Sequence, residues 1–161
     1  MIDSAYLREL LRKAHADDPW HGPSTTDVLE GITAAQAAAH PVPGAHSIWE
    51  IVLHLAAWCG EVTRRLEGNP PAMPAEGDWP AIGEVSAVAW ERAQKHLDAT
   101  HAHVLENLTR LHDADLDRLG GSLNDRALGT GVTHRTMVEG LLQHAAYHSG
   151  QIALLRKVLG R

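Results

Sequence analysis

The chain has 161 residues and a formal charge of -6, and it is rich in alanine and leucine and lacks phenylalanine. This length suits one domain and is short for two, and the composition favours helices over a sheet. The acidic balance argues against nucleic-acid binding, and no apolar run approaches the roughly 18 residues of a membrane span. A single cysteine and an amino terminus unlike a signal peptide predict a cytoplasmic location.

The first half of the chain is expected to form two longer helices with two short ones between them. Apolar residues at helical spacing predict a helix over residues 2–16. Residues 26–31 and 33–40 are typical of two short helical pieces, the second ended by a proline-rich turn. A long helix is predicted over residues 47–67, with His54 on its inward apolar stripe.

The second half is expected to add two more long helices. A proline-, glycine- and alanine-rich stretch follows residue 68, and it is long for a connection between helices. Helices are predicted over residues 84–111 and from Thr133, as the cap, to residue 160. Four long helices predict an all-α four-helix bundle with a long crossover between the second and the third, and one domain over residues 1–161.

The last predicted helix carries His144 and His148, four residues apart. Such positions lie about 40° apart around a helix and about 6 Å apart along it, so both imidazoles can converge on one point. They fall on the face that the apolar pattern directs into the core. Two unpaired core imidazoles would be costly, and a metal ion is one way to satisfy them.

His54 is the natural third partner, because a helix bundle places its functional side chains on facing helices. Three histidine nitrogens leave coordination positions open for water or substrate, which is typical of a catalytic metal site rather than a closed structural one. Spacing alone leaves a second interpretation open, in which the three are hydrogen-bonded core histidines without a metal.

Two further residues are candidates to support such a site. Gln151 lies three positions after His148 on nearly the same face and can hydrogen-bond a water on the metal, cap the core or hold a neighbouring helix. His101 points inward and either supports the site or is a satisfied core histidine. Seven other histidines are expected at caps, turns or solvated faces: His15, His21, His40, His46, His96, His112 and His134.

For the aromatic and sulfur-containing side chains near these histidines, packing in the core is an alternative to a role in the site. Trp49 and Trp58 bracket His54 and either wall a pocket or pack in the core. Tyr147 is about 100° from the ligand face and is expected to pack between helices. Cys59 is expected to be a packed thiol.

Two stretches about ninety residues apart stand out together. The first is HSIWEIVLHLAAW at 46–58, followed by LEG at 66–68, and the second is HAAYHSGQI at 144–152, followed by LRK at 155–157. In order and spacing they resemble the two signatures of the DinB/YfiT-like metalloenzyme family. The resemblance implies a four-helix bundle with a long crossover, a homodimer, and a divalent metal ion (zinc, nickel or iron) on His54, His144 and His148.

The resemblance also implies a metal-dependent enzyme, since such families include hydrolases and transferases that attach low-molecular-weight thiols to electrophiles. Either chemistry fits an ion that lowers the pKa of a bound water or thiol. The expected partners are a small-molecule substrate and a low-molecular-weight thiol. No catalytic base is identified, because Glu50 and Glu139 can simply be solvated. The alternative is a non-catalytic, metal-stabilised dimeric bundle that binds or senses a small molecule.

Overall fold

A computed structural model describes residues 3–120 and 128–160. Every regular element within these ranges is a helix, which confirms the all-α prediction. The helices are α1 (Ser4–Ala16), α2 (Thr25–Leu29), α3 (Ala34–Ala38), α4 (Ile48–Leu66), α5 (Ala87–Arg110), α6 (Asp113–Leu116) and α7 (His134–Val158). Among them, none has the length and apolar character needed to cross a membrane.

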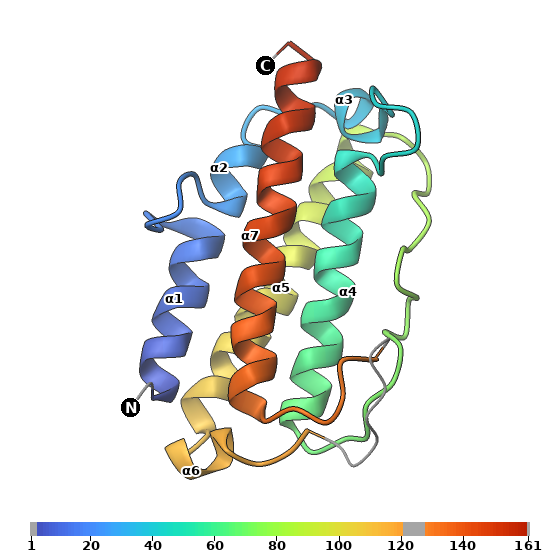
Figure 1. The fold of residues 1–161 in the computed structure, drawn as a ribbon. Coiled ribbons are helices and arrows are strands. Elements are labelled where there is room, and N and C mark those ends of the chain that lie inside the picture. Colours follow the sequence, from blue (N-terminus) through green and yellow to red (C-terminus); the bar gives the residue numbers. More distant parts are fainter. Residues whose placement is uncertain (1–2, 121–127, 161) are drawn as a thin grey trace.

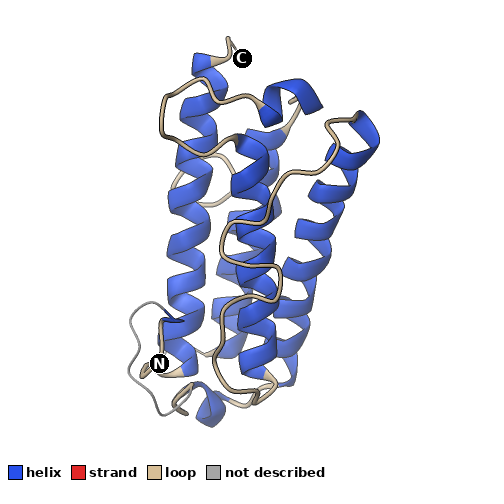
Figure 2. Cartoon of the chain, turned by 90° about the vertical axis from the view of Figure 1, so that its right-hand side faces the viewer, coloured by secondary structure: helices blue, strands red, loops and turns tan. Residues whose placement is uncertain are grey.

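The four long helices lie side by side along one axis (Figure 1). α4 packs against α5 and α7, and α1 packs against α5 and α7 as well, while the short helices close the two ends. α4 and α5 run in the same direction. Residues 67–86 connect them by returning along the length of the bundle as irregular chain (Figure 2).

Buried polar residues separate the core into two apolar clusters. One cluster lies at the end of the bundle that carries α2 and α3, and the other lies toward α6. On α5 the first cluster ends at Leu97 and the second begins at Val104, with the buried His101 between them. On α7 the corresponding limits are Ile152 and Leu141, and the buried His148 lies between them. The middle of the bundle is therefore its polar layer.

Side-chain caps fix where the helices that carry this layer begin. Ser47 accepts a hydrogen bond from the Glu50 amide, and the Glu50 carboxylate accepts one from the Ser47 amide, so α4 begins at Ile48. Thr133 caps α7 in the predicted position. α5 begins at Ala87, three residues later than predicted, because Ser86 is its cap.

Candidate metal centre

Three histidines from two helices meet in the polar layer. His54 from α4 and His144 and His148 from α7 each offer a nitrogen within 4.8 Å of the other two. The Nε2 atoms of His54 and His144 are 2.8 Å apart, and the ring centroids of His144 and His148 are 4.5 Å apart. His54 and His148 are buried and His144 is half-buried. The structure thus brings together the three residues that their spacing singled out.

A backbone carbonyl of the crossover sets the orientation of His54. Its Nδ1 lies 2.6 Å from the carbonyl oxygen of Asp78. Because a carbonyl oxygen only accepts, Nδ1 carries the proton and the lone pair on Nε2 faces the cluster. The Asp78 carboxylate accepts a 2.7 Å hydrogen bond from Nε1 of Trp58 and lies 3.3 Å from the same Nδ1 of His54. This arrangement is typical of a histidine held ready to bind a metal.

An aromatic stack holds the other face of His54. The Trp79 ring lies parallel to the His54 ring at a centroid distance of 3.9 Å, and the His46 ring lies against Trp79 at 3.5 Å. His46 is exposed, as predicted, although one face of its ring stacks on Trp79. Sequence reasoning missed Asp78 and Trp79 because they lie in an irregular segment, where no periodicity says which way a side chain points. Their only signal was their place in a stretch otherwise rich in proline, glycine and alanine.

Gln151 orients His148 in the same way that the Asp78 carbonyl orients His54. Nδ1 of His148 lies 2.6 Å from Oε1 of Gln151. The amide oxygen accepts from Nδ1–H, so the Nε2 lone pair of His148 is free. Support of the site was one of the roles left open for Gln151, and its observed contact is with the imidazole of His148.

Burial keeps the three histidines neutral. It lowers the pKa of His144 to about 4, with a further contribution from the neighbouring His148 and His54. It also lowers the pKa of His148 to about 4, against the opposing effect of the Gln151 hydrogen bond, and brings the pKa of His54 below its ordinary value. Neutral imidazole is the form that binds metals.

The donor set of the cluster fits a divalent cation. His54 and His148 both direct lone pairs inward, and a single N–H of His144 cannot satisfy both of them. Imidazole nitrogens suit zinc, nickel and iron alike, so the donors do not select among these metals.

Leucine in place of Gln151 is expected to weaken zinc binding about 10- to 100-fold, because the orienting hydrogen bond to His148 is lost. The matched control is Gln143→Leu, which changes the same side chain at an exposed position of α7 and should leave the affinity unchanged. Calorimetric titration with Zn²⁺ measures both. Equal affinities for Gln151→Leu and the unmodified protein would show that Gln151 does not orient the ligand.

His101 lies against α1 instead of joining the cluster. Its ring stacks on His15 at a centroid distance of 4.1 Å, and it donates a hydrogen bond to the Leu11 carbonyl. His15 is 9% exposed and lies 2.8 Å from a carboxylate oxygen of Asp98, so the prediction of a solvated His15 was wrong. His134 was also expected at the surface or as a cap and is 7% exposed. The His15 ring lies against His101 and Asp98 of α5, whereas the His134 ring lies close to Gly120 in the irregular segment before α7.

Acid is expected to destabilise the fold through His101. Burial, helped by the neighbouring His15, lowers the pKa of His101 from 6.5 to about 3. The unfolded chain therefore binds this proton first, and the contribution to stability is complete above pH 6.5 and is lost as the pH falls toward 3. Between pH 6.5 and 5 the loss is about 2 kcal/mol. Urea unfolding across this range should show a shallower pH dependence for His101→Gln than for the exposed control His103→Gln. Identical slopes would contradict the assignment.

Other predicted side chains divide between core and surface. Trp49 is buried beside Trp90, whereas Trp58 lines a cavity. Cys59 is a packed thiol, as predicted, and burial raises its pKa to about 12. Tyr147 was predicted to pack between helices, but it is 64% exposed, and its ring lies edge-on to that of His148 at a centroid distance of 5.0 Å.

Two cavities adjoin the cluster, and His54 and Asp78 line both of them. The first, of about 430 Å³, reaches His144 and lies between α4, α7 and the segment from Leu128 to Val132. The second, of about 550 Å³, reaches His148 and is bounded by Trp79 and residues 42–46. A bound small molecule can therefore approach the imidazoles from either cavity.

One of three comparisons with known proteins assigns the chain to a family. Neither the curated proteins nor the solved structures contain a match to the chain. A family model described as the DinB superfamily matches residues 20–152, a range that contains all three clustered histidines. The match extends from the turn before α2 to the last part of α7. The chain therefore belongs to the DinB superfamily.

Proposed function

We propose that this protein is a metal-dependent enzyme in which His54, His144 and His148 hold one divalent ion: zinc, nickel or iron. The observation that carries the proposal is the convergence of three neutral imidazoles, two of them with Nδ1 fixed by an acceptor oxygen. Proteins of the DinB-like family commonly bind metals, which supports the same conclusion.

The proposed reaction is hydrolysis or the transfer of a low-molecular-weight thiol to an electrophile. When bound, the ion supplies Lewis acidity that lowers the pKa of a water or thiol at its open positions. The chain supplies the binding cavities and a proton acceptor. Asp78 is the carboxylate that lines both cavities, and its side chain is 42% exposed, so it can take the proton that the nucleophile gives up.

To test the proposal, the protein is loaded with zinc, nickel or iron, and turnover is measured on two panels of substrates. One panel contains esters and amides, and the other contains electrophiles with added thiols. Activity that disappears in His148→Ala, while circular dichroism shows an intact fold, supports an enzyme. A protein that binds the metal and a small molecule but turns over nothing in either panel supports the alternative, a non-catalytic binding or sensing bundle.

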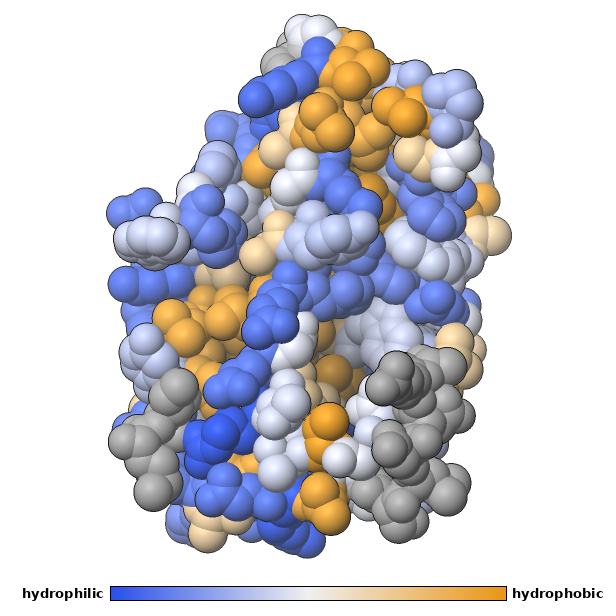
Figure 3. All heavy atoms as spheres, viewed as in Figure 1, coloured by the Kyte–Doolittle hydropathy of each residue, from blue (hydrophilic) through white to orange (hydrophobic). Residues whose placement is uncertain are grey.

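We also propose that the protein is a homodimer. Apolar side chains gather on the surface over the end of α7 (Figure 3), and Leu154 and Val158 are among the exposed ones. An exposed apolar face of this kind is typical of a protein–protein contact. Light scattering coupled to size-exclusion chromatography tests it, and a monomer at micromolar concentration would overturn it.

A further inference from the structure

We infer that the cavity beside His54 and His144 binds an uncharged, predominantly apolar molecule and holds its reactive group against these two histidines. The reaction rests on the proposed function, but the binding does not, because the walls of the cavity that hold such a molecule are independent of the metal. Three features of the cavity point to such a ligand: its lining, the charges at its edge and a glycine in α7.

The lining of this cavity is largely apolar. Trp58 and Val62 contribute from α4, Met137 and Leu141 from α7, and Val132 from the segment before α7. Its volume of about 430 Å³ falls within the range of small-molecule sites. Binding there is driven by the burial of apolar surface, and the molecule reaches the imidazoles at one edge.

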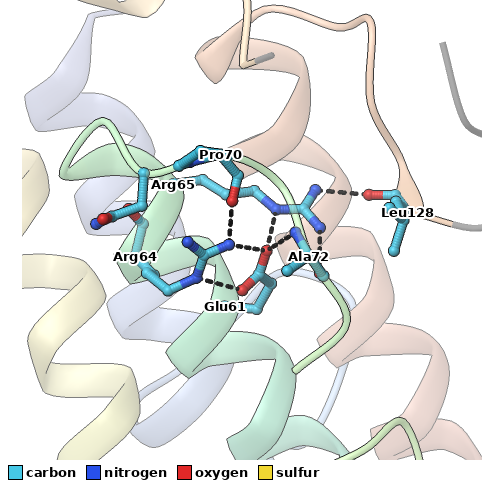
Figure 4. Close-up of polar contacts among 7 residues, drawn as sticks. Glu61, Arg64, Arg65, Pro70, Ala72 and Leu128 are labelled. Atoms are coloured by element: carbon cyan, nitrogen blue, oxygen red, sulfur yellow. Dashed lines mark hydrogen bonds and ion pairs between the residues drawn. The ribbon is translucent and has the colours of Figure 1, made fainter. Parts of the chain in front are cut away.

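Among the described residues that line this cavity, the cation is Arg65, and it is already paired. Arg65 is 4% exposed, and its Nε donates a 2.7 Å hydrogen bond to the buried carboxylate of Glu61. Its two terminal nitrogens donate to the carbonyl oxygens of Leu128 and Ala72, at 2.6 and 3.1 Å (Figure 4). Every guanidinium nitrogen thus has an acceptor within the protein. Arg65 shapes the wall of the cavity and is not available to neutralise an anionic ligand.

The carboxylate at the edge of the cavity works against an anion. Asp78 lines the cavity and accepts a hydrogen bond from Trp58, one of the apolar wall residues. Among the described residues that line the cavity, no cation is free to offset this like charge for an anionic molecule, while a neutral molecule avoids the cost. In the protein without its metal ion, these charges therefore favour an uncharged ligand.

The space in this cavity depends in part on a missing side chain. Gly140 lies on α7, one turn before His144, and it lines the cavity. A Cβ built at Gly140 would meet nothing within 4 Å. A larger side chain at this position can therefore extend into the cavity without disturbing the backbone, and any residue but proline favours the helix more than glycine does.

The test uses two fluorescent probes with one skeleton, neutral N-phenylnaphthylamine and its anionic relative anilinonaphthalene sulfonate, on metal-stripped protein. The neutral probe should bind at least about tenfold more tightly than the anion, because only the anion meets Asp78 unpaired. Gly140→Leu should weaken the binding of the neutral probe at least about tenfold, because the leucine side chain fills part of the cavity. Gly140→Ala should weaken this binding less, because its side chain is smaller. Gly150→Leu is the control, since it places the same side chain at an exposed position of α7 with open space around it.

Tighter binding of the anionic probe would overturn the inference, and so would equal binding by the Gly140 variants and the unmodified protein. Metal affinity is measured on the same samples and separates the two proposals. A protein that binds the neutral probe in this cavity but binds no metal keeps the inference and refutes the proposed function. A protein that binds metal but does not bind the neutral probe refutes the inference and leaves the proposed function standing.

Discussion

Alanine in place of His144 is expected to weaken zinc binding at least about 100-fold, since even residues that only orient a metal ligand are worth 10- to 100-fold. The variant removes one of three donors and leaves two imidazoles, whose Nδ1 atoms are still held by Asp78 and Gln151. Competition against a zinc chelator of known affinity measures the change. His54→Ala and His148→Ala should show losses of the same order, because the three nitrogens share one point.

The matched control for these variants is His103→Ala, which removes an exposed histidine from α5. It should bind zinc like the unmodified protein. The three site variants should also stay folded without metal. Removing one imidazole relieves a cluster in which there are too few N–H groups to satisfy the lone pairs of the ring nitrogens. Zinc affinity that falls equally in His103→Ala, or that survives in any site variant, would contradict a three-histidine site.

Leucine in place of Glu61 is expected to cost about 3–5 kcal/mol of unfolding free energy, the usual cost of leaving one partner of a buried ion pair alone. The Glu61 side chain is 2% exposed, and its carboxylate accepts hydrogen bonds from Arg65, Arg64 and the Ala72 amide (Figure 4). Burial opposes its ionisation, yet these hydrogen bonds win and hold the pKa of Glu61 below its usual range.

A second variant and a control make this prediction specific. Glu61→Leu combined with Arg65→Met should recover most of the lost stability, because replacing both members of a buried pair by apolar residues is often neutral. Glu106→Leu breaks a Glu–Arg pair of the same spacing on the exposed surface of α5, and should cost less than about 1 kcal/mol. Urea unfolding measures all three. A Glu61→Leu loss no larger than that of Glu106→Leu would show that the network does not stabilise the fold.

The regular part of the fold could be predicted from the sequence. Helical periodicity predicted α4 and α7 to within about two residues and placed His54, His144 and His148 on facing sides of the core. The cap at Thr133 was predicted from its residue type alone. These features depend on the spacing of residues that are close together in the sequence, so they can be read from the sequence directly.

The contacts made by irregular segments could not be predicted in the same way. Asp78 and Trp79 reach His54 only because the crossover returns along the bundle, and no local pattern determines that path. Glu61 and Arg65 are four apart on α4, a spacing equally typical of an exposed pair. Their burial depends on Leu128 and Ala72, which come from separate segments of the chain.

The most direct test of the three-histidine site is the metal content of the protein, expressed without an affinity tag and measured by elemental mass spectrometry. The absence of a tag matters because added histidines would bind metal themselves. We predict about one divalent ion per chain, because the three converging neutral imidazoles form one set of ligands. A protein that holds no ion, even after incubation with zinc, nickel and iron followed by desalting, would contradict the metal centre and the enzyme proposed on it.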